Sequence, residues 1–283
     1  MKNNNTYIFA LTLVATLGGL LFGYDTAVIS GTVESLRKFF IEPQGLPLDQ
    51  ANALEGFVVS SALIGCILGA SFAGWISQRY GRKPTLILAA ILFLLSAIGS
   101  AWPELFIGMP GSGDHTFMYA FVAYRILGGI GVGLASMVSP MYIAEVAPAD
   151  RRGNLVAWNQ FAIIFGQLVV YFVNFLILGE NSNPVIKAIE GVNQILNPEA
   201  AAWTTEIGWR LMFVSEAVPA GVFALLVLFV PETPRYLAMS GKDDKALQVL
   251  SRINGLAQAK VILSQIKATA EEKTEKLFTY GWV

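Results

Sequence analysis

The sequence contains little charge, one cysteine and one histidine. Asp, Glu, Lys and Arg make up 14% of its 283 residues, whereas soluble domains carry about 25%. The scarcity of cysteine and histidine argues against a disulfide framework, a metal site and a His-centred catalytic triad. We therefore expect no metal, no cofactor and no enzymatic activity. The net charge of −1 also argues against nucleic acid as a partner, because it provides no basic footprint.

Apolar residues are abundant instead, at 54% of the chain, with a mean hydropathy of +0.56. A membrane-spanning helix needs about 20 mainly apolar residues. Six segments qualify: 7–29, 56–76, 85–101, 117–138, 155–178 and 211–230. The first is too long for the core of a signal peptide, so we expect it to remain in the protein. The sequence thus predicts an all-α, multi-pass protein embedded in a lipid bilayer.

Short loops after the second, fourth and sixth segments are rich in Lys and Arg. By the positive-inside rule these loops, the N-terminus and the C-terminal tail are cytoplasmic. We expect a six-helix bundle over residues 1–238, a cytoplasmic helical linker over 239–276 and the start of a seventh helix over 277–283. The linker helices are amphipathic, which favours a position at the membrane surface; ordinary solvated linker helices are the alternative.

One acidic residue, Asp25, lies near the end of the first apolar segment. An ionised carboxylate at membrane depth is costly, so it usually faces a cavity or a partner on an ion or proton path. We interpret Asp25 as a proton-titrating group in a transport pathway. The alternative is a carboxylate that reaches water near the helix end. Gly19 and Gly23 share one helix face, which predicts close contact with another helix.

The fourth segment carries Arg125 just before a glycine-rich run. A guanidinium at this depth is also costly, so we expect Arg125 to share an ion pair or a wet cavity with Asp25. A carboxylate held between burial and a nearby guanidinium makes a workable proton switch. Alternatively, Arg125 lies near the outer membrane interface, at a level marked by Tyr119 and Tyr124.

Amide side chains recur every seven residues in the fifth segment, at Gln160, Gln167 and Asn174. They therefore form one polar stripe on an apolar helix. Amides both donate and accept hydrogen bonds, which suits an uncharged, poly-hydroxylated ligand such as a sugar. The alternative is bonding between helices, which we prefer for Asn174 but not for Gln160 and Gln167.

Charged residues end helices on the side predicted to be cytoplasmic. Arg82 follows the second segment, the stretch from Glu145 to Arg152 links the fourth and fifth, and Glu232 and Arg235 follow the sixth. These residues predict an ion-pair network that favours one arrangement of the bundle, with exposed pairs worth about 0–1 kcal/mol each. Positive charge that only sets the orientation is the alternative.

Four signatures, in this order, resemble the sugar porter family of the major facilitator superfamily. They are GYDTAVISG at 23–31, RYGRK at 79–83, PMYIAEVAPADRRG at 140–153 and PETPRYL at 231–237. Lys83 departs from the family pattern, which has Arg there. The resemblance implies a twelve-helix transporter with two six-helix halves and a sugar site between them. This chain would then be the N-terminal half, and the missing C-terminal half would be its partner.

The resemblance also implies roles for single residues. Asp25 would be the proton-coupling acid and Arg125 its partner. Gln160 would bind sugar hydroxyls, with Gln167 close by and Phe22 on the pocket wall. The cytoplasmic gate would consist of Arg82, Glu145, Arg152, Glu232 and Arg235.

The expected function is proton-coupled uptake of a monosaccharide, xylose or a similar pentose or hexose such as glucose, across a bacterial cytoplasmic membrane. Facilitative family members generally lack an acid at the position of Asp25, so its presence favours symport. A facilitative sugar uniporter is the first alternative. A membrane sugar sensor that does not transport is the second. A half-transporter that pairs with a second copy of itself is a further alternative.

Overall fold

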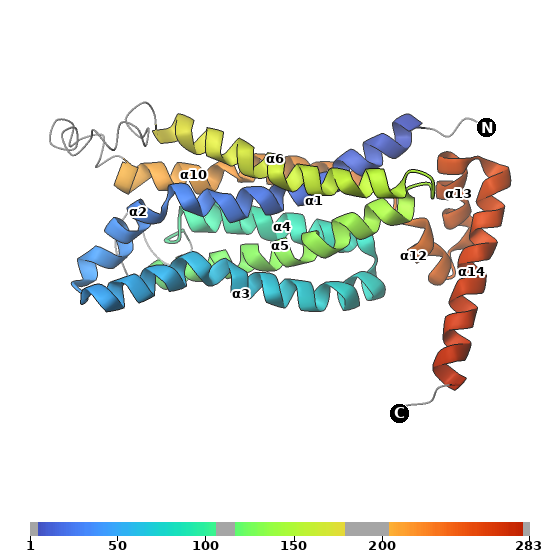
Figure 1. The fold of residues 1–283 in the computed structure, drawn as a ribbon, viewed down its shortest axis with the longest axis horizontal. Helices are drawn as coiled ribbons and strands as arrows, with labels where there is room; N and C mark the ends of the chain where they lie inside the picture. The colour runs from blue at the N-terminus through green and yellow to red at the C-terminus, as the bar shows by residue number, and fades with distance from the viewer. Residues whose placement is uncertain (1–4, 106–116, 179–203, 280–283) are drawn as a thin grey trace.

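The computed structural model describes residues 5–105, 117–178 and 204–279, and the elements in these ranges are helical (Figure 1). In chain order they are α1 (Asn5–Val28), η1 (Ile29–Gly31), α2 (Val33–Leu36), η2 (Arg37–Ile41), η3 (Glu42–Gln44), α3 (Leu48–Tyr80), α4 (Arg82–Ala101), α5 (Met118–Val146), α6 (Arg152–Leu178), η6 (Thr204–Gly208), α10 (Trp209–Ser215), α11 (Ala217–Phe229), α12 (Pro234–Met239), α13 (Asp243–Asn254) and α14 (Leu256–Thr279).

The described residues contain six helical segments that are long and apolar enough to cross a membrane. Each overlaps one of the six predicted segments, and they run roughly parallel in Figure 1. The all-α, membrane-spanning fold class is therefore confirmed. We call the end of the bundle that carries α12–α14 the tail end, and the opposite end, which carries α2, the α2 end.

Three predicted segments need correction. The second span is longer than 56–76 and runs from Leu48 to Tyr80. The fourth span does not end near Val138 but continues through Pro140 to Val146. The sixth predicted segment is two helices, because a turn at Glu216 separates α10 from α11. Proline and local breaks are tolerated in spanning helices where neighbouring groups satisfy the freed backbone.

Glycine allows two pairs of helices to approach backbone to backbone. A methyl group at Gly23 of α1 would collide with the Ile163 carbonyl of α6, and one at Gly19 would lie 2.9 Å from the Asn159 carbonyl. Similarly, a methyl group at Gly65 of α3 would collide with the Ile126 carbonyl of α5. Small residues permit this contact between membrane helices, so the predicted packing role of Gly19 and Gly23 is confirmed.

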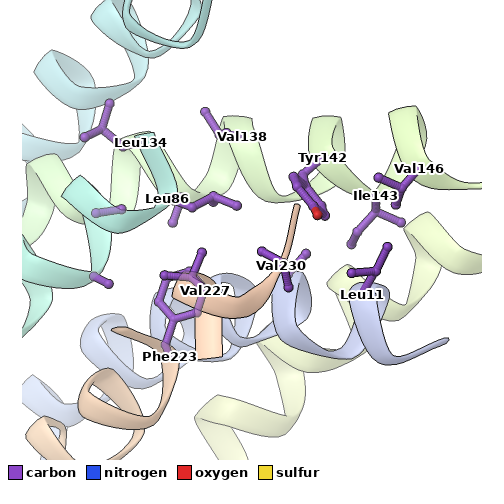
Figure 2. Close-up of a cluster of buried hydrophobic side chains, with 14 of the residues drawn as sticks. Leu11, Leu86, Leu134, Val138, Tyr142, Ile143, Val146, Phe223, Val227 and Val230 are labelled. Carbon is purple, nitrogen blue, oxygen red and sulfur yellow. The ribbon is translucent and has the colours of Figure 1, made fainter. Parts of the chain in front are cut away.

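Two apolar clusters fill the bundle. Figure 2 shows the one nearer the tail end, where Tyr142 of α5 packs with Val227 of α11 and Val230, just past its end. The Tyr142 hydroxyl donates 2.8 Å to the Pro231 carbonyl, which fixes the chain as it leaves α11. The second cluster lies toward the α2 end. There Phe40 of η2, Phe121 of α5 and Trp209 of α10 are fully buried.

The tail helices pack on protein. Ala246, Val249 and Ile253 of α13 are buried and belong to the tail-end apolar cluster. This face therefore contacts the bundle rather than a membrane surface. Helix α14 continues without a break from 256 to 279, and residues 280–283 of the predicted seventh helix lie outside the described residues. The division at 238 and 276 stays a prediction.

Candidate functional site

The structure brings Asp25 and Arg125 together inside the bundle. Arg125 Nη1 donates to Asp25 Oδ1 at 2.6 Å, and Nη2 lies 3.4 Å from the Asp25 carbonyl oxygen. Asp25 is 0% exposed and Arg125 is 1% exposed. The guanidinium carbon also lies 5.4 Å from the centre of the Phe213 ring. Arg125 is thus paired with the acid in the interior and does not lie at an interface.

A third ionisable side chain, Glu216, belongs to the same cluster. It occupies the turn between α10 and α11, is 0% exposed and interacts electrostatically with both Asp25 and Arg125. The sequence interpretation missed it. The signal was nevertheless present, because Glu216 is a lone acid in an apolar segment, as Asp25 is. We call Asp25, Arg125 and Glu216 the mid-bundle cluster.

The mid-bundle cluster contains two carboxylates for one guanidinium. With both acids ionised its net charge is −1, and one bound proton makes it neutral. Asp25 Oδ2 and both Glu216 carboxylate oxygens accept no hydrogen bond from a donor group within the described residues, but the two carboxyl groups are near enough to bond to each other when one carries a proton. Like charges at close range in a buried site disfavour double ionisation. The proton-coupling role of Asp25 and Arg125 stays a prediction.

A neighbouring hydrogen bond holds α10 against α1 beside this cluster. The Tyr24 and Ser215 hydroxyl oxygens are 2.7 Å apart, and the Ser215 hydroxyl donates to the Met212 carbonyl at 2.6 Å. Tyr24 is consequently the donor to Ser215. The bond joins the residues directly preceding Asp25 and Glu216, so it fixes the spacing of the two carboxylates.

Gln160 and Gln167, the two glutamines predicted to contact a ligand, lie on α6, a helix that contributes no residue to the mid-bundle cluster. Gln160 is exposed and Gln167 is half-buried on α6, while Phe22 of α1 is half-buried against the apolar core. Neither glutamine side chain has a hydrogen-bond partner in the part of the chain that the structure describes. Both amides therefore remain free to bind a polar molecule.

The other amides of α6 contact α1. Asn174 Nδ2 lies 3.4 Å from the Val28 carbonyl, and Asn159 is buried against Gly19. Asn174 therefore bonds between helices, as we preferred from the sequence. The amides of α6 thus divide between a face directed at α1 and a face that is open.

At the tail end, part of the predicted charge network is formed. Arg82 Nη2 donates to Glu145 Oε1 at 2.8 Å, and both side chains are 8% exposed. The same guanidinium donates to the Ser77 carbonyl and lies 5.6 Å from the centre of the Tyr236 ring. This pair joins the α3–α4 turn to the end of α5.

Glu232 makes a different kind of contact. Its carboxylate accepts the backbone N–H groups of Arg82 (3.1 Å), Lys83 (3.1 Å) and Thr233 (2.8 Å). Arg82 and Lys83 are the first residues of α4, so Glu232 caps a helix whose N-terminal donors are otherwise free. Burial raises the pKa of Glu232, while these three donors act in the opposite direction.

Arg152 and Arg235 are exposed and form no ion pair among the described residues. Both line a cavity of about 830 Å³ between the end of α5 and helices α12–α14, which Glu145 and Asp150 also line. The gate that the sequence predicts is thus only partly assembled in this structure, and its role stays a prediction. In the described ranges no group of three or more acidic, His or Cys side chains suits a metal ion.

Comparison with known proteins is decisive about the family. The family model described as "Sugar (and other) transporter" matches residues 11–282. The chain belongs to this family. Its resemblance to sugar porters, predicted from the four signatures, is therefore confirmed.

Individual relatives agree with this assignment. The chain is 52% identical to the D-xylose-proton symporter of Escherichia coli over 272 residues, which are 93% of this chain and 51% of that protein. It is 34% identical to the glucose facilitated diffusion protein of Zymomonas mobilis over 284 residues, covering 99% of this chain and 55% of that one.

The fold is that of a solved major facilitator protein. The structure of the proton:xylose symporter XylE bound to 6-bromo-6-deoxy-D-glucose superposes with a TM-score of 0.88 at 49% identity, covering 99% of this chain and 57% of that chain. The chain thus spans about half the length of the relatives it matches.

Proposed function

We propose that this chain forms the N-terminal six-helix half of a transporter that moves a monosaccharide together with a proton. The observation that carries the proposal is the mid-bundle cluster. It is fully buried in a membrane-spanning bundle and holds two acids against one base. A purely structural pair needs no second carboxylate, whereas proton coupling needs a group whose charge changes.

The proposed mechanism begins with a proton binding to the cluster at Asp25. The protonated carboxyl no longer attracts Arg125 as an ion, so the guanidinium turns toward Glu216 and loosens the contact between α1 and α5. That loosening allows the two halves of the transporter to rock about the bound sugar. Release of the proton on the other side restores the pair.

The open amides of α6 are the proposed sugar contacts. Gln160 and Gln167 have no protein partner among the described residues. Phe22, half-buried on α1, is proposed as an apolar wall of the same site. Amides and one aromatic ring match the hydroxyls and C–H surface of a sugar. Xylose is the first substrate to test, because the E. coli relative that is 52% identical is named for it; glucose is the second.

We further propose that the tail end faces the cytoplasm of a bacterial cell, with the N-terminus on the same side. Arg82, Lys83, Arg151 and Arg152 gather there in short connections, as the positive-inside rule requires. Arg152 and Arg235 line the tail-end cavity without ion-pair partners among the described residues. They are proposed to complete the gate when the C-terminal half contacts this surface.

Facilitated diffusion is the competing function, because the Zymomonas relative is named for it. The two are separated by reconstituting the complete gene product into vesicles under an imposed pH gradient. Coupled transport predicts accumulation of labelled xylose above the outside concentration, and no accumulation with Asp25→Asn. Counterflow of labelled xylose, which needs no net proton movement, should survive in that variant.

The outcome that contradicts the proposal is accumulation by Asp25→Asn equal to that of the unaltered protein. Equilibration without accumulation in both proteins would instead support the uniporter. Saturable sugar binding with no counterflow would support a sensor.

A further inference from the structure

Two buried serines of α4, Ser96 and Ser100, are notable among the described residues because Ser96 lies close to the mid-bundle cluster. Ser96 is 1% exposed and Ser100 is 0% exposed, and neither hydroxyl has a hydrogen-bond partner within the described residues. Some other buried helical serines differ. Ser61 and Ser77, for example, donate to the carbonyl three residues earlier. Buried polar groups are normally bonded to protein or to ordered water.

Gly128 of α5 lies close to both Ser96 and Asp25. A methyl group at Gly128 would collide with the Ser96 hydroxyl oxygen and would lie 3.5 Å from Asp25 Oδ1. The two oxygens therefore lie around the same glycine methylene, with only a short gap between them. One water molecule making two hydrogen bonds of about 2.8 Å each spans such a gap.

Ser100 extends the same line toward the α2 end. It lies four residues beyond Ser96 on one face of α4, a step of about 6 Å along the helix axis. The next residue, Ala101, accepts a hydrogen bond of 2.8 Å from Arg210 through its carbonyl. Arg210 in turn forms a buried pair with Glu104, at 2.6 and 3.0 Å. Trp209 Nε1, on the adjoining α10, is likewise buried and unpartnered within the described residues.

We infer that Ser96 and Ser100, with intervening water, form a proton relay that connects the α2 end of the bundle to Asp25. The relay runs inside the six-helix bundle between α4, α5 and α10. It is thus separate from the open face of α6, where the sugar is proposed to bind. The inference rests on the proposed proton coupling and adds the route by which the proton arrives.

The chemistry of the relay conserves every proton. Each hydroxyl accepts a proton on one side and releases its own to the next water, so no net charge remains on serine. The last water transfers its proton to an oxygen of Asp25, whose charge falls to zero. The titratable groups nearest this line are Asp25, Arg125, Glu216, Tyr24, Glu104 and Arg210. Within the described residues all of them except Glu216 have a hydrogen-bond partner, and Asp25 keeps one oxygen, Oδ2, without one.

The test uses Ser96→Ala/Ser100→Ala in the complete gene product, reconstituted in vesicles. We expect proton-driven xylose uptake to fall at least tenfold, because a methyl group neither accepts nor donates a proton. Xylose counterflow should stay within twofold, since the sugar site is on another face. Gly128→Ala, which fills the gap between Ser96 and Asp25, should reproduce the slow uptake. D₂O should slow the uptake that remains in the double variant by a larger factor than it slows uptake by the unaltered protein.

Ser139→Ala is the matched control. Ser139 is also fully buried in a spanning helix and also unpartnered within the described residues, but it packs against Gly18, toward the tail end. Xylose uptake by the Ser139→Ala variant should equal that of the unaltered protein. If the double variant does not fold, Ser100→Ala alone carries the test.

Three outcomes would overturn the relay. They are unaltered uptake in the double variant, an equal loss in Ser139→Ala, and a parallel loss of uptake and counterflow, which would assign the serines a structural role. Absence of any sugar-linked proton movement in the unaltered protein would refute the proposed function itself, and the relay with it.

Discussion

Two buried ion pairs in this bundle differ in how completely their atoms are bonded. At the α2 end, Glu104 and Arg210 form a two-pronged pair in which each carboxylate oxygen accepts one guanidinium N–H. Arg210 also donates to two backbone carbonyls and lies 4.5 Å from the centre of the Trp209 ring. Asp25 and Arg125 share one short bond, and a second acid stands beside them with both oxygens unpartnered in the described chain.

The difference indicates different roles for the two pairs. A pair with every atom bonded is rigid, and changing its charge is costly because each partner is left alone. A cluster with one more acid than base can bind a proton and become neutral. Its second carboxylate also gives the guanidinium another group to bond. We therefore assign the α2-end pair to structure and the mid-bundle cluster to charge change.

The largest expected effect is on stability, from Arg210→Met. The substitution leaves the Glu104 carboxylate buried without a partner, which typically costs about 3–5 kcal/mol. The loss of stability is measured by monitoring helicity during unfolding in mixed micelles. Arg37→Met is the matched control, because its pair with Glu55 is partly exposed and should be worth about 0–1 kcal/mol. Equal losses in the two variants would remove the structural assignment of the α2-end pair.

Gly81→Ala extends the comparison to Glu232, a half-buried acid. Gly81 has φ +108°, and a methyl group there would collide with Glu232 Oε2. Strained backbone of this kind costs about 1–3 kcal/mol, and the clash also displaces Glu232 from the N–H groups of α4. Gly74→Ala is the control, since a methyl group there meets nothing within 4 Å and alanine is favoured inside a helix. We expect a lower melting temperature for the first variant and an equal or higher one for the second.

Glu216→Gln tests whether the second acid matters. It removes the excess charge but keeps an oxygen to which Arg125 can donate when it leaves Asp25. We expect accumulation of xylose to fall about tenfold, equivalent to roughly 1.4 kcal/mol, with the fold intact. Counterflow in the same vesicles provides the control. Accumulation equal to that of the unaltered protein would show that Asp25 and Arg125 suffice.

The smallest effect is a pH dependence of stability from Glu232. Burial raises its pKa above the ordinary value of 4.5, so the folded protein keeps a proton that the unfolded chain has released. Its contribution to stability is therefore fully present below pH 4.5 and is lost as the pH rises through the raised value. Melting temperatures of Glu232→Gln should show a shallower decline over that window. Parallel curves for the two proteins would contradict this sign.

The sequence predicts much of this arrangement because membrane burial is a strict constraint. Apolar runs of about twenty residues mark the spans. Isolated charged residues within them, such as Asp25 and Arg125, are least costly to bury when they pair with each other. Glycine spacing likewise predicts the contact of α1 with another helix, although not that the partner is α6. These inferences need only the cost of burying a charge and the period of a helix.

Other features depend on distant residues meeting. Glu104 and Arg210 flank predicted spans and resemble solvated loop charges until the fold buries them together. Glu232 looks like part of an ion-pair network, yet its partners are backbone N–H groups that no sequence pattern displays. The short helices from Ile29 to Gln44 have no long periodic run, so their packing against Trp209 becomes visible only in three dimensions.

The central claim is that sugar binding is linked to one proton at the mid-bundle cluster. Calorimetry of xylose binding in buffers of different ionisation enthalpy counts that proton directly. We predict uptake approaching one proton per sugar near neutral pH for the complete gene product, and none for Asp25→Asn. Equal proton uptake in both proteins would contradict the account.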